Sequence, residues 1–194
     1  MDLQDILVIP LQTGALLIPV IVAVLGYWFT KRNQMELTRW REHLDLINSR
    51  LNEFYGPLFV QSEVGHMAYK TLIDKMGGEE VFRQVPIEAG VLEEWRVWVE
   101  TIFLPLNQAS EDLIMRNAHL IREEEFPASL LLFIMHATSY RAMVAKWKQG
   151  DYSEYLPQAD YPVELSSYAA QSYRELKHEQ LQLIGKLKPK QAPQ

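Results

Sequence analysis

The hydrophobic residues of this chain follow helical spacing over most of its length. After residue 36 they recur alternately three and four positions apart, which places them on one face of a helix. This first series is Leu37, Trp40, Leu44, Ile47, Leu51, Phe54 and Leu58. Three heptads are compatible with a short coiled coil or with a bundle helix that has a narrow apolar face. No stretch alternates as a β-strand does, so the pattern predicts an all-α protein.

Three more helices are predicted after this first one. We expect the first helix to end at Met76-Gly77-Gly78, because glycine commonly follows a helix C-terminus. The third helix, expected over 127–148, has no charge from Phe126 to Tyr140, which is typical of a helix that is apolar on nearly every side. The second helix has its apolar series at Val91, Trp95, Trp98, Ile102, Leu106, Ala109 and Leu113. The fourth begins near Pro162, with inward residues expected at Leu165, Tyr168 or Ala169, Ser172, Leu176, Leu183 and Leu187. The four helices predict a four-helix bundle over 31–188.

The N-terminal region contains a long run without charge. Residues 6–29 read ILVIPLQTGALLIPVIVAVLGYWF, and about 20 such residues are enough to cross a bilayer. The run follows Asp2 and Asp5 rather than the basic residues of a signal peptide. We therefore expect a retained transmembrane helix over 6–30; the alternative is a buried hairpin of a soluble protein.

Positive charge is distributed unevenly around this predicted span. None precedes it, whereas four basic residues follow soon after: Lys31, Arg32, Arg39 and Arg41. The positive-inside rule then puts residues 1–5 outside the cell and the bundle in the cytosol. Tyr27 and Trp28, with Lys31 and Arg32, are expected to anchor the helix at the membrane interface. The tail 189–194 is expected to be disordered.

Two prolines lie inside the predicted first and second helices. Residues 57–63 and 105–111 both read P-L-x-x-x-S-E and are 48 positions apart. A proline inside a helix kinks it at a cost of about 3 kcal/mol, and a preceding glycine lowers the resistance of the residue before proline to the helical conformation. We expect both helices to continue through facing kinks at Gly56, Pro57 and Pro105. The alternative is two helix breaks and a chance match.

Composition narrows the possible partners and chemistry. The net charge of −6 disfavours nucleic acid as a partner, because binding to phosphates relies on Lys and Arg. The chain has no cysteine, which excludes disulfides, thiolate metal sites and cysteine nucleophiles. No G-x-S-x-G motif and no phosphate-binding glycine loop is present, so we expect no enzyme activity and no cofactor.

Two Glu-x-x-His motifs raise the possibility of a two-metal site, at Glu63–His66 and Glu175–His178. In four-helix bundles such a site also takes a carboxylate from each of the other helices. The predicted third helix offers none over 128–147, and His178 falls on the solvent side of its helix. We expect no bound metal.

Two polar aromatic residues, His136 and Tyr140, lie one turn apart in the uncharged helix. They could form a polar pocket or a proton relay, or His136 could simply be a buried histidine that bonds a neighbouring hydroxyl. His119 is a third candidate for this pocket, or else a contact at a helix end. We retain all three as the possible small-ligand site.

A resemblance supports the membrane interpretation. The stretches EEEFPASLLLFIMHATSYRAMVAKWKQGDYSEY and LNEFYGPL resemble segments of uncharacterised bacterial proteins that combine one N-terminal transmembrane helix with a helical cytosolic domain. This resemblance implies an inner-membrane protein and brings no catalytic motif. The function we expect is a membrane-anchored interaction or scaffold module that self-associates or docks another protein. The alternative is a sensor of a small ligand or lipid near His136 and Tyr140.

Overall fold

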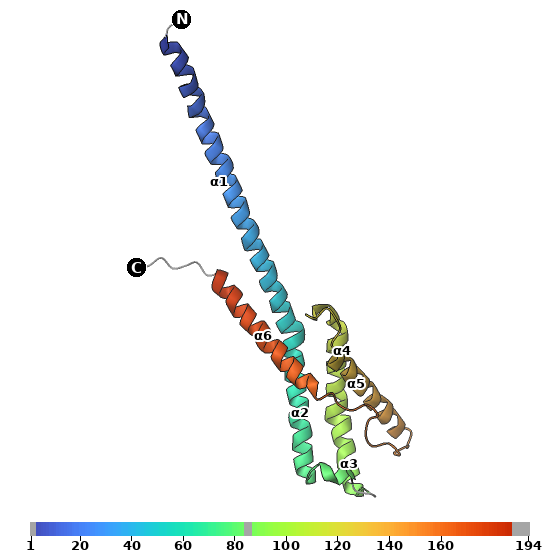
Figure 1. Cartoon of the computed structure of the whole chain (residues 1–194). Coiled ribbons are helices and arrows are strands. Elements are labelled where there is room, and N and C mark those ends of the chain that lie inside the picture. The colour runs from blue at the N-terminus through green and yellow to red at the C-terminus, as the bar shows by residue number, and fades with distance from the viewer. Residues whose placement is uncertain (1–2, 84–86, 188–194) are drawn as a thin grey trace, which may run out of the picture. The chain divides into compact units, whose positions relative to one another are not determined.

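The computed structural model describes the backbone of residues 3–83 and 87–187, and the side chains of residues 21–82 and 87–186. Helices make up all of its regular structure within these ranges (Figure 1), so the all-α prediction is confirmed. The α-helices are α1 (Leu3–Ser49), α2 (Gly56–Met76), α3 (Ala89–Trp98), α4 (Leu104–Arg116), α5 (Ala128–Trp147) and α6 (Glu164–Leu187). Two π-helical segments, η1 (Arg50–Tyr55) and η3 (Val99–Phe103), and two 3-10 segments, η2 (Glu79–Arg83) and η4 (Ala118–Leu120), complete them.

The chain divides into two compact units. The larger one, Leu46–Gln182, contains most of the packing and is here called the helical body. The second unit holds the residues before Leu46 and after Gln182, where the ammonium of Lys186 lies 4.5 Å from the ring centre of Trp40. The predicted span over 6–30 lies largely outside the described side chains, and the tail 189–194 lies wholly outside the described residues.

One helix of the described part, α5, is long and apolar enough to cross a membrane. In its most apolar window 39% of the residues are buried inside the protein. A core helix of a soluble protein has the same length and composition. The burial therefore explains the apolar sequence of α5 at least in part.

The helical body is built around α2 and α4. After the turn at its end, the chain returns through α3, and α4 runs antiparallel beside α2 (Figure 1). Helix α5 packs on α4, and α6 packs on η1 and α2, where the rings of Phe59 and Tyr173 stack at 5.3 Å. A hydrophobic cluster joins α2, α3, η3 and α5; its buried members are Leu72, Trp95, Val99, Phe103, Tyr140, Met143, Val144 and Trp147.

The end of α2 is as predicted. Gly77 has φ of 90°, a left-handed conformation that favours glycine. The N–H of Gly78 donates to the carbonyl of Ile73 at 2.9 Å. This hydrogen bond satisfies one of the carbonyls that every helix C-terminus leaves open.

Helical structure continues through both prolines, and a π-helical segment precedes each of them. The N–H of Gly56 donates to the carbonyl of Leu51, five residues back, and the N–H of Leu104 donates to Val99 in the same way. A proline ring collides with the carbonyl four residues before it in a regular helix. The wider π turn moves that carbonyl away, so each helix accepts its proline. The paired kinks themselves stay a prediction.

The π turn in η3 moves the most buried positions of the predicted second helix away from the predicted series, although Trp98 and Ile102 of that series still pack, partly buried, against the hydrophobic cluster. The buried residues there are Trp95, Val99, Phe103, Asn107, Ser110 and Ile114, whereas Ala109 is exposed. A π turn contains more residues than an α turn. The inward positions after it therefore fall one residue later than a regular 3–4 series predicts.

The two remaining helices both carry the apolar residues that the sequence predicted. In α6, Leu165, Ala169, Ser172 and Leu176 are all buried, which confirms the predicted inward face. Helix α5 is buried on one face, at Leu130, Phe133, His136, Ala137, Tyr140, Met143, Val144 and Trp147. Its opposite face is apolar as well but exposed, so the apolar character predicted on nearly every side extends beyond the buried face.

Candidate functional site

A small, partly open cavity with several polar lining residues lies in the helical body, between α2, α4, α5 and the start of α6. Its volume is about 20 Å³, which is enough for about one water molecule. The lining residues are Leu58, Gln61, Ser62, Gly65, Leu106, Asn107, Ser110, Phe133, Tyr161 and Leu165. Five of them carry side-chain amide or hydroxyl groups: Gln61, Ser62, Asn107, Ser110 and Tyr161. Such groups are mostly exposed in folded proteins.

The hydroxyls in this lining bond to protein groups, while one amide does not. The hydroxyl of Ser62 donates to the carbonyl of Phe59 at 2.9 Å, and that of Ser110 donates to Oε1 of Gln61 at 2.8 Å. Asn107 is only 8% exposed, yet its amide makes no hydrogen bond to any described residue. No fully buried side-chain N or O atom of the described residues lacks a hydrogen-bond partner, so the amide of Asn107 is accessible from the cavity and can bond a molecule there.

The local fold explains why these polar groups gather here. Ser62 and Ser110 are the serines of the two P-L-x-x-x-S-E segments, which α2 and α4 bring to the same cavity. The π turn in η3 rotates Asn107 and Ser110 inward, where a regular helix would place Leu106 and Ala109. Each segment therefore contributes to the cavity through the π turn and proline that precede it.

An aromatic cluster adjoins the cavity through Phe133 and Tyr161. Nδ1 of His136 lies 2.8 Å from the carbonyl oxygen of Ala159. A carbonyl can only accept, so Nδ1 carries the proton. Burial lowers the pKa of His136, which keeps the ring neutral. The ring centre of Tyr161 lies 5.4 Å from that of His136, edge to face.

The sequence-predicted pair His136 and Tyr140 does come together, with ring centres 4.8 Å apart. Burial raises the pKa of both Tyr140 and Tyr161, so both phenols keep their protons. His119 is exposed in η4 and is not among the residues that line the cavity. The bonding partner of His136 is a backbone carbonyl rather than the hydroxyl that the sequence suggested.

Comparisons with known proteins do not identify a function for this site. Comparison of the chain with protein-family models, curated protein sequences and solved structures gave no match. The resemblance to uncharacterised bacterial membrane proteins therefore stays an expectation.

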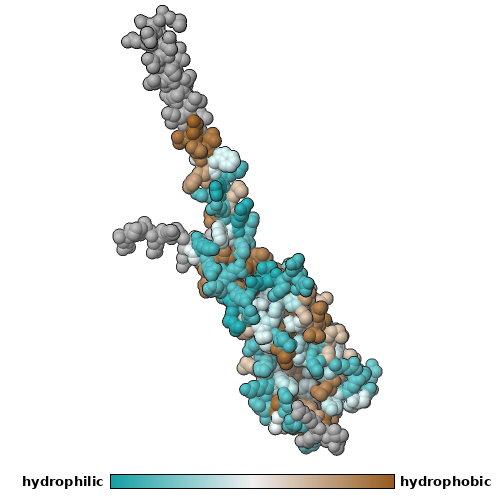
Figure 2. Space-filling view, viewed as in Figure 1, coloured by the Kyte–Doolittle hydropathy of each residue, from teal (hydrophilic) through white to brown (hydrophobic). Residues whose placement is uncertain are grey.

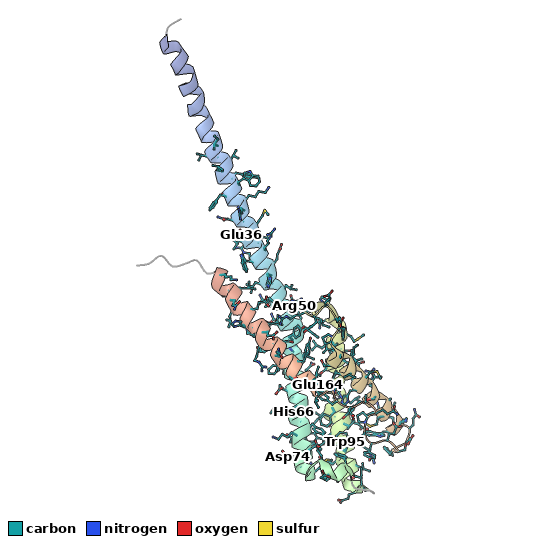
Figure 3. All side chains as sticks on the ribbon, in the orientation of Figure 1. Glu36, Arg50, His66, Asp74, Trp95 and Glu164 are labelled. Carbon is teal, nitrogen blue, oxygen red and sulfur yellow. The ribbon has the colours of Figure 1, made fainter. Side chains whose placement is uncertain are left out.

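The segment 151–163 lies over the aromatic cluster and is here called the strap. Three ring N–H groups hold it by its backbone carbonyls. Trp95, which Figure 3 labels, donates to Tyr155 at 2.6 Å, Trp147 donates to Glu154 at 2.7 Å, and His136 donates to Ala159. Because Tyr161 belongs to the strap and also lines the cavity, the strap forms part of the cavity wall.

A second polar cluster surrounds the hydroxyl of Tyr55, at the end of η1. This hydroxyl accepts from the N–H of Arg122 at 3.0 Å and lies 3.3 Å from that of Tyr168. Both hydroxyls also bond the carboxylate of Glu123, at 3.2 and 3.1 Å. Burial is the largest cause that raises the pKa of each tyrosine. The cluster fastens the turn before α5 to η1 and α6.

The remaining candidate residues lie on the surface. His66 and His178 are exposed, and no group of three or more potential metal ligands gathers among the described side chains. The predicted interface anchors Tyr27 and Trp28 are 64% and 69% exposed. The ammonium of Lys31 lies 5.8 Å from the ring centre of Tyr27.

Sequence reasoning missed Gln61 and Asn107 as parts of a site. The repeated serine was visible in the P-L-x-x-x-S-E match and could have drawn attention to Ser62 and Ser110. Asn107 had no such signal, because its inward position depends on a π turn that no residue type marks.

Proposed function

We propose that the protein is a single-pass membrane-anchored module whose helical body binds a second copy or another protein. The observation that supports the anchor is the exposure of every side chain from residue 21 to 29 on α1. Ile21, Val22 and Leu25 are 55%, 61% and 63% exposed, and Figure 2 shows hydrophobic residues at this part of α1. Apolar surface costs about 25 cal/mol per Å² in water, so a bilayer is the natural environment for this segment.

The proposed topology follows from the charges beside that segment. Lys31 and Arg32 come directly after it, and Arg32 lies 3.7 Å from Glu36 in an exposed ion pair. The positive-inside rule favours the cytosol for this side. We therefore place the span at 6–30 in the inner membrane, with the N-terminus outside and the body in the cytosol as a four-helix bundle.

Membrane fractionation of the full-length chain tests the anchor. We expect the protein to remain in the membrane pellet after an alkaline wash and to enter solution in mild detergent. A variant without residues 1–32 should appear in the soluble fraction. Full-length protein that behaves as a soluble protein would contradict the proposal.

The interaction role needs its own measurement. In mild detergent, light scattering coupled to size exclusion should give a protein mass above that of one chain, or affinity capture of the full-length chain should retrieve a stoichiometric partner. A strictly monomeric protein that retrieves no partner would overturn this role.

A second candidate is a sensor of a small polar ligand, favoured by the unbonded amide of Asn107 in the cavity. The cavity volume of about 20 Å³ limits the ligand to about the size of water unless the strap moves. A rise in melting temperature with a small polar ligand, lost in Asn107→Leu but kept in the exposed control Asn33→Leu, would support this candidate. No shift with any small polar compound would remove it.

A further inference from the structure

The exposed face of α5 carries a regular series of uncharged residues. Its positions alternate three and four apart, as in the seam of a coiled coil, and every one of them is exposed: Ala128, Leu131, Met135, Thr138, Ala142 and Ala145. Leu131 and Met135 are 53% and 59% exposed. This set is here called the outer seam. The outer face of a solvated helix normally carries charges instead.

The charged side chains of α5 are neutralised beside the outer seam. Arg141 pairs with Glu111 of α4, and Lys146 lies 2.6 Å from Glu154 of the strap. No charged residue occupies a seam position. The outer seam can therefore be covered without burying an uncompensated charge, which is the main cost of most polar interfaces.

Side-chain size changes along the outer seam in a way that suits a second copy in the opposite direction. The two large residues, Leu131 and Met135, lie before Thr138, and the small residues Ala142 and Ala145 lie after it; Ala128 at the N-terminal end is small as well. If two α5 helices cross antiparallel with a twofold axis at Thr138, Leu131 faces Ala145 of the other copy and Met135 faces Ala142. A parallel pair would instead set large residues against large ones and leave a gap between the alanines.

The charges at the ends of α5 are compatible with the antiparallel direction. Lys148 is exposed just after α5 and, with the axis at Thr138, lies near residue 128 of the other copy, one helical turn from the exposed Glu124. Asp151 is also exposed at this end, so the favourable contact is that of Lys148 alone. A twofold axis makes this contact twice, since both copies use the same surface.

We propose that the outer seam of α5 is a homodimer interface in which two copies pack antiparallel about a twofold axis at Thr138. This inference rests on the proposed function, because it specifies the partner and the surface for the interaction role. It explains why α5 is apolar on the face that its own chain does not cover.

Disulfide cross-linking tests the position of the axis, because the chain has no cysteine of its own. Thr138→Cys, introduced in the full-length protein in mild detergent, should form a disulfide-linked dimer under mild oxidation. The matched control is Met67→Cys on α2, where the side chain is 64% exposed and should not cross-link above background. Equal cross-linking of the two variants would overturn the proposed interface.

A mixed experiment tests the direction of the helices. Leu131→Cys and Ala145→Cys chains, co-expressed with different tags, should give a cross-linked heterodimer. Each variant alone should give little, because the same residues of the two copies lie far apart in the antiparallel arrangement. Strong cross-linking of Leu131→Cys with itself would show a parallel pair and contradict the proposal.

A charge placed on the outer seam separates failure of this interface from failure of the proposed function. Met135→Glu should reduce the protein mass in detergent to one chain, while Met67→Glu should leave it unchanged. If the protein self-associates but Met135→Glu has no effect, only the interface is wrong. If the wild type is monomeric and retrieves no partner, the interaction role fails as well.

Quenching of a fluorophore at residue 135 by labelled lipid, without cross-linking at 138, would assign the face to the bilayer.

Discussion

Gly56 shows how a single residue type makes the π turn before Pro57 possible. A Cβ at this position would lie 2.4 Å from the carbonyl oxygen of Leu51, because the π turn brings that carbonyl against the residue five positions later. The equivalent position in η3 is Leu104, which carries a side chain. The two π turns therefore differ in detail, and the first depends on glycine.

Gly56→Ala should destabilise the helical body by about 2 kcal/mol, because the new methyl group forces the backbone of η1 to move. Gly185→Ala is the matched control, since a Cβ there meets nothing within 4 Å and alanine favours a helix. Chemical denaturation followed by circular dichroism measures both. A Gly56→Ala protein as stable as the wild type would show that η1 does not have this geometry in solution.

His136 makes stability depend on pH. Burial lowers its pKa in the folded state, so below about pH 6.5 the unfolded chain binds a proton that the folded chain resists. Stability should therefore be constant above about pH 7.5 and fall as pH drops below about 6.5. His136→Gln should remove much of this decline in the thermal melting temperature, whereas the exposed control His119→Gln should retain it.

The strap is the element that depends most on contacts with distant residues. Its composition marks it only as a loop, yet two indoles and one imidazole hold its backbone. Trp95 belongs to the apolar series predicted for its helix, and both Trp95 and Trp147 are buried. Their hydrogen bonds to Tyr155 and Glu154 could not be predicted, since backbone carbonyls carry no sequence signal.

Replacing these indoles should loosen the strap. Trp95→Phe and Trp147→Phe each leave a strap carbonyl without its donor, at a cost of about 1 kcal/mol. Hydrogen exchange at residues 151–160 should become faster in both variants. Trp98→Phe is the control, because its indole donates to Glu94 of its own helix at 2.8 Å. Unchanged exchange in all three variants would contradict the anchoring role.

The whole molecule combines a helical body with a segment that no described protein surface covers. The proposed membrane anchor accounts for the apolar side chains between residues 21 and 29. By holding copies in one membrane, the proposed anchor would also raise their local concentration and favour self-association.

A charge in the proposed span should impair membrane insertion. Val22→Arg places a guanidinium in the hydrocarbon region at a cost of about 2 to 3 kcal/mol, so the fraction of protein in the alkali-washed membrane pellet should fall. Val163→Arg is the control, at a position that is 78% exposed in the helical body. Equal pellet fractions for the two variants would count against the anchor.

The sequence alone determined the helical class, the end of α2 and the inward face of α6, because each depends on local spacing or on glycine at a left-handed position. Tertiary structure decided the rest. The π turn of η3 shifted the core from the predicted series to Val99, Phe103 and Asn107, and packing on one side left the other face of α5 open. A helical repeat predicts which residues share a face, but the neighbouring elements decide which face is buried.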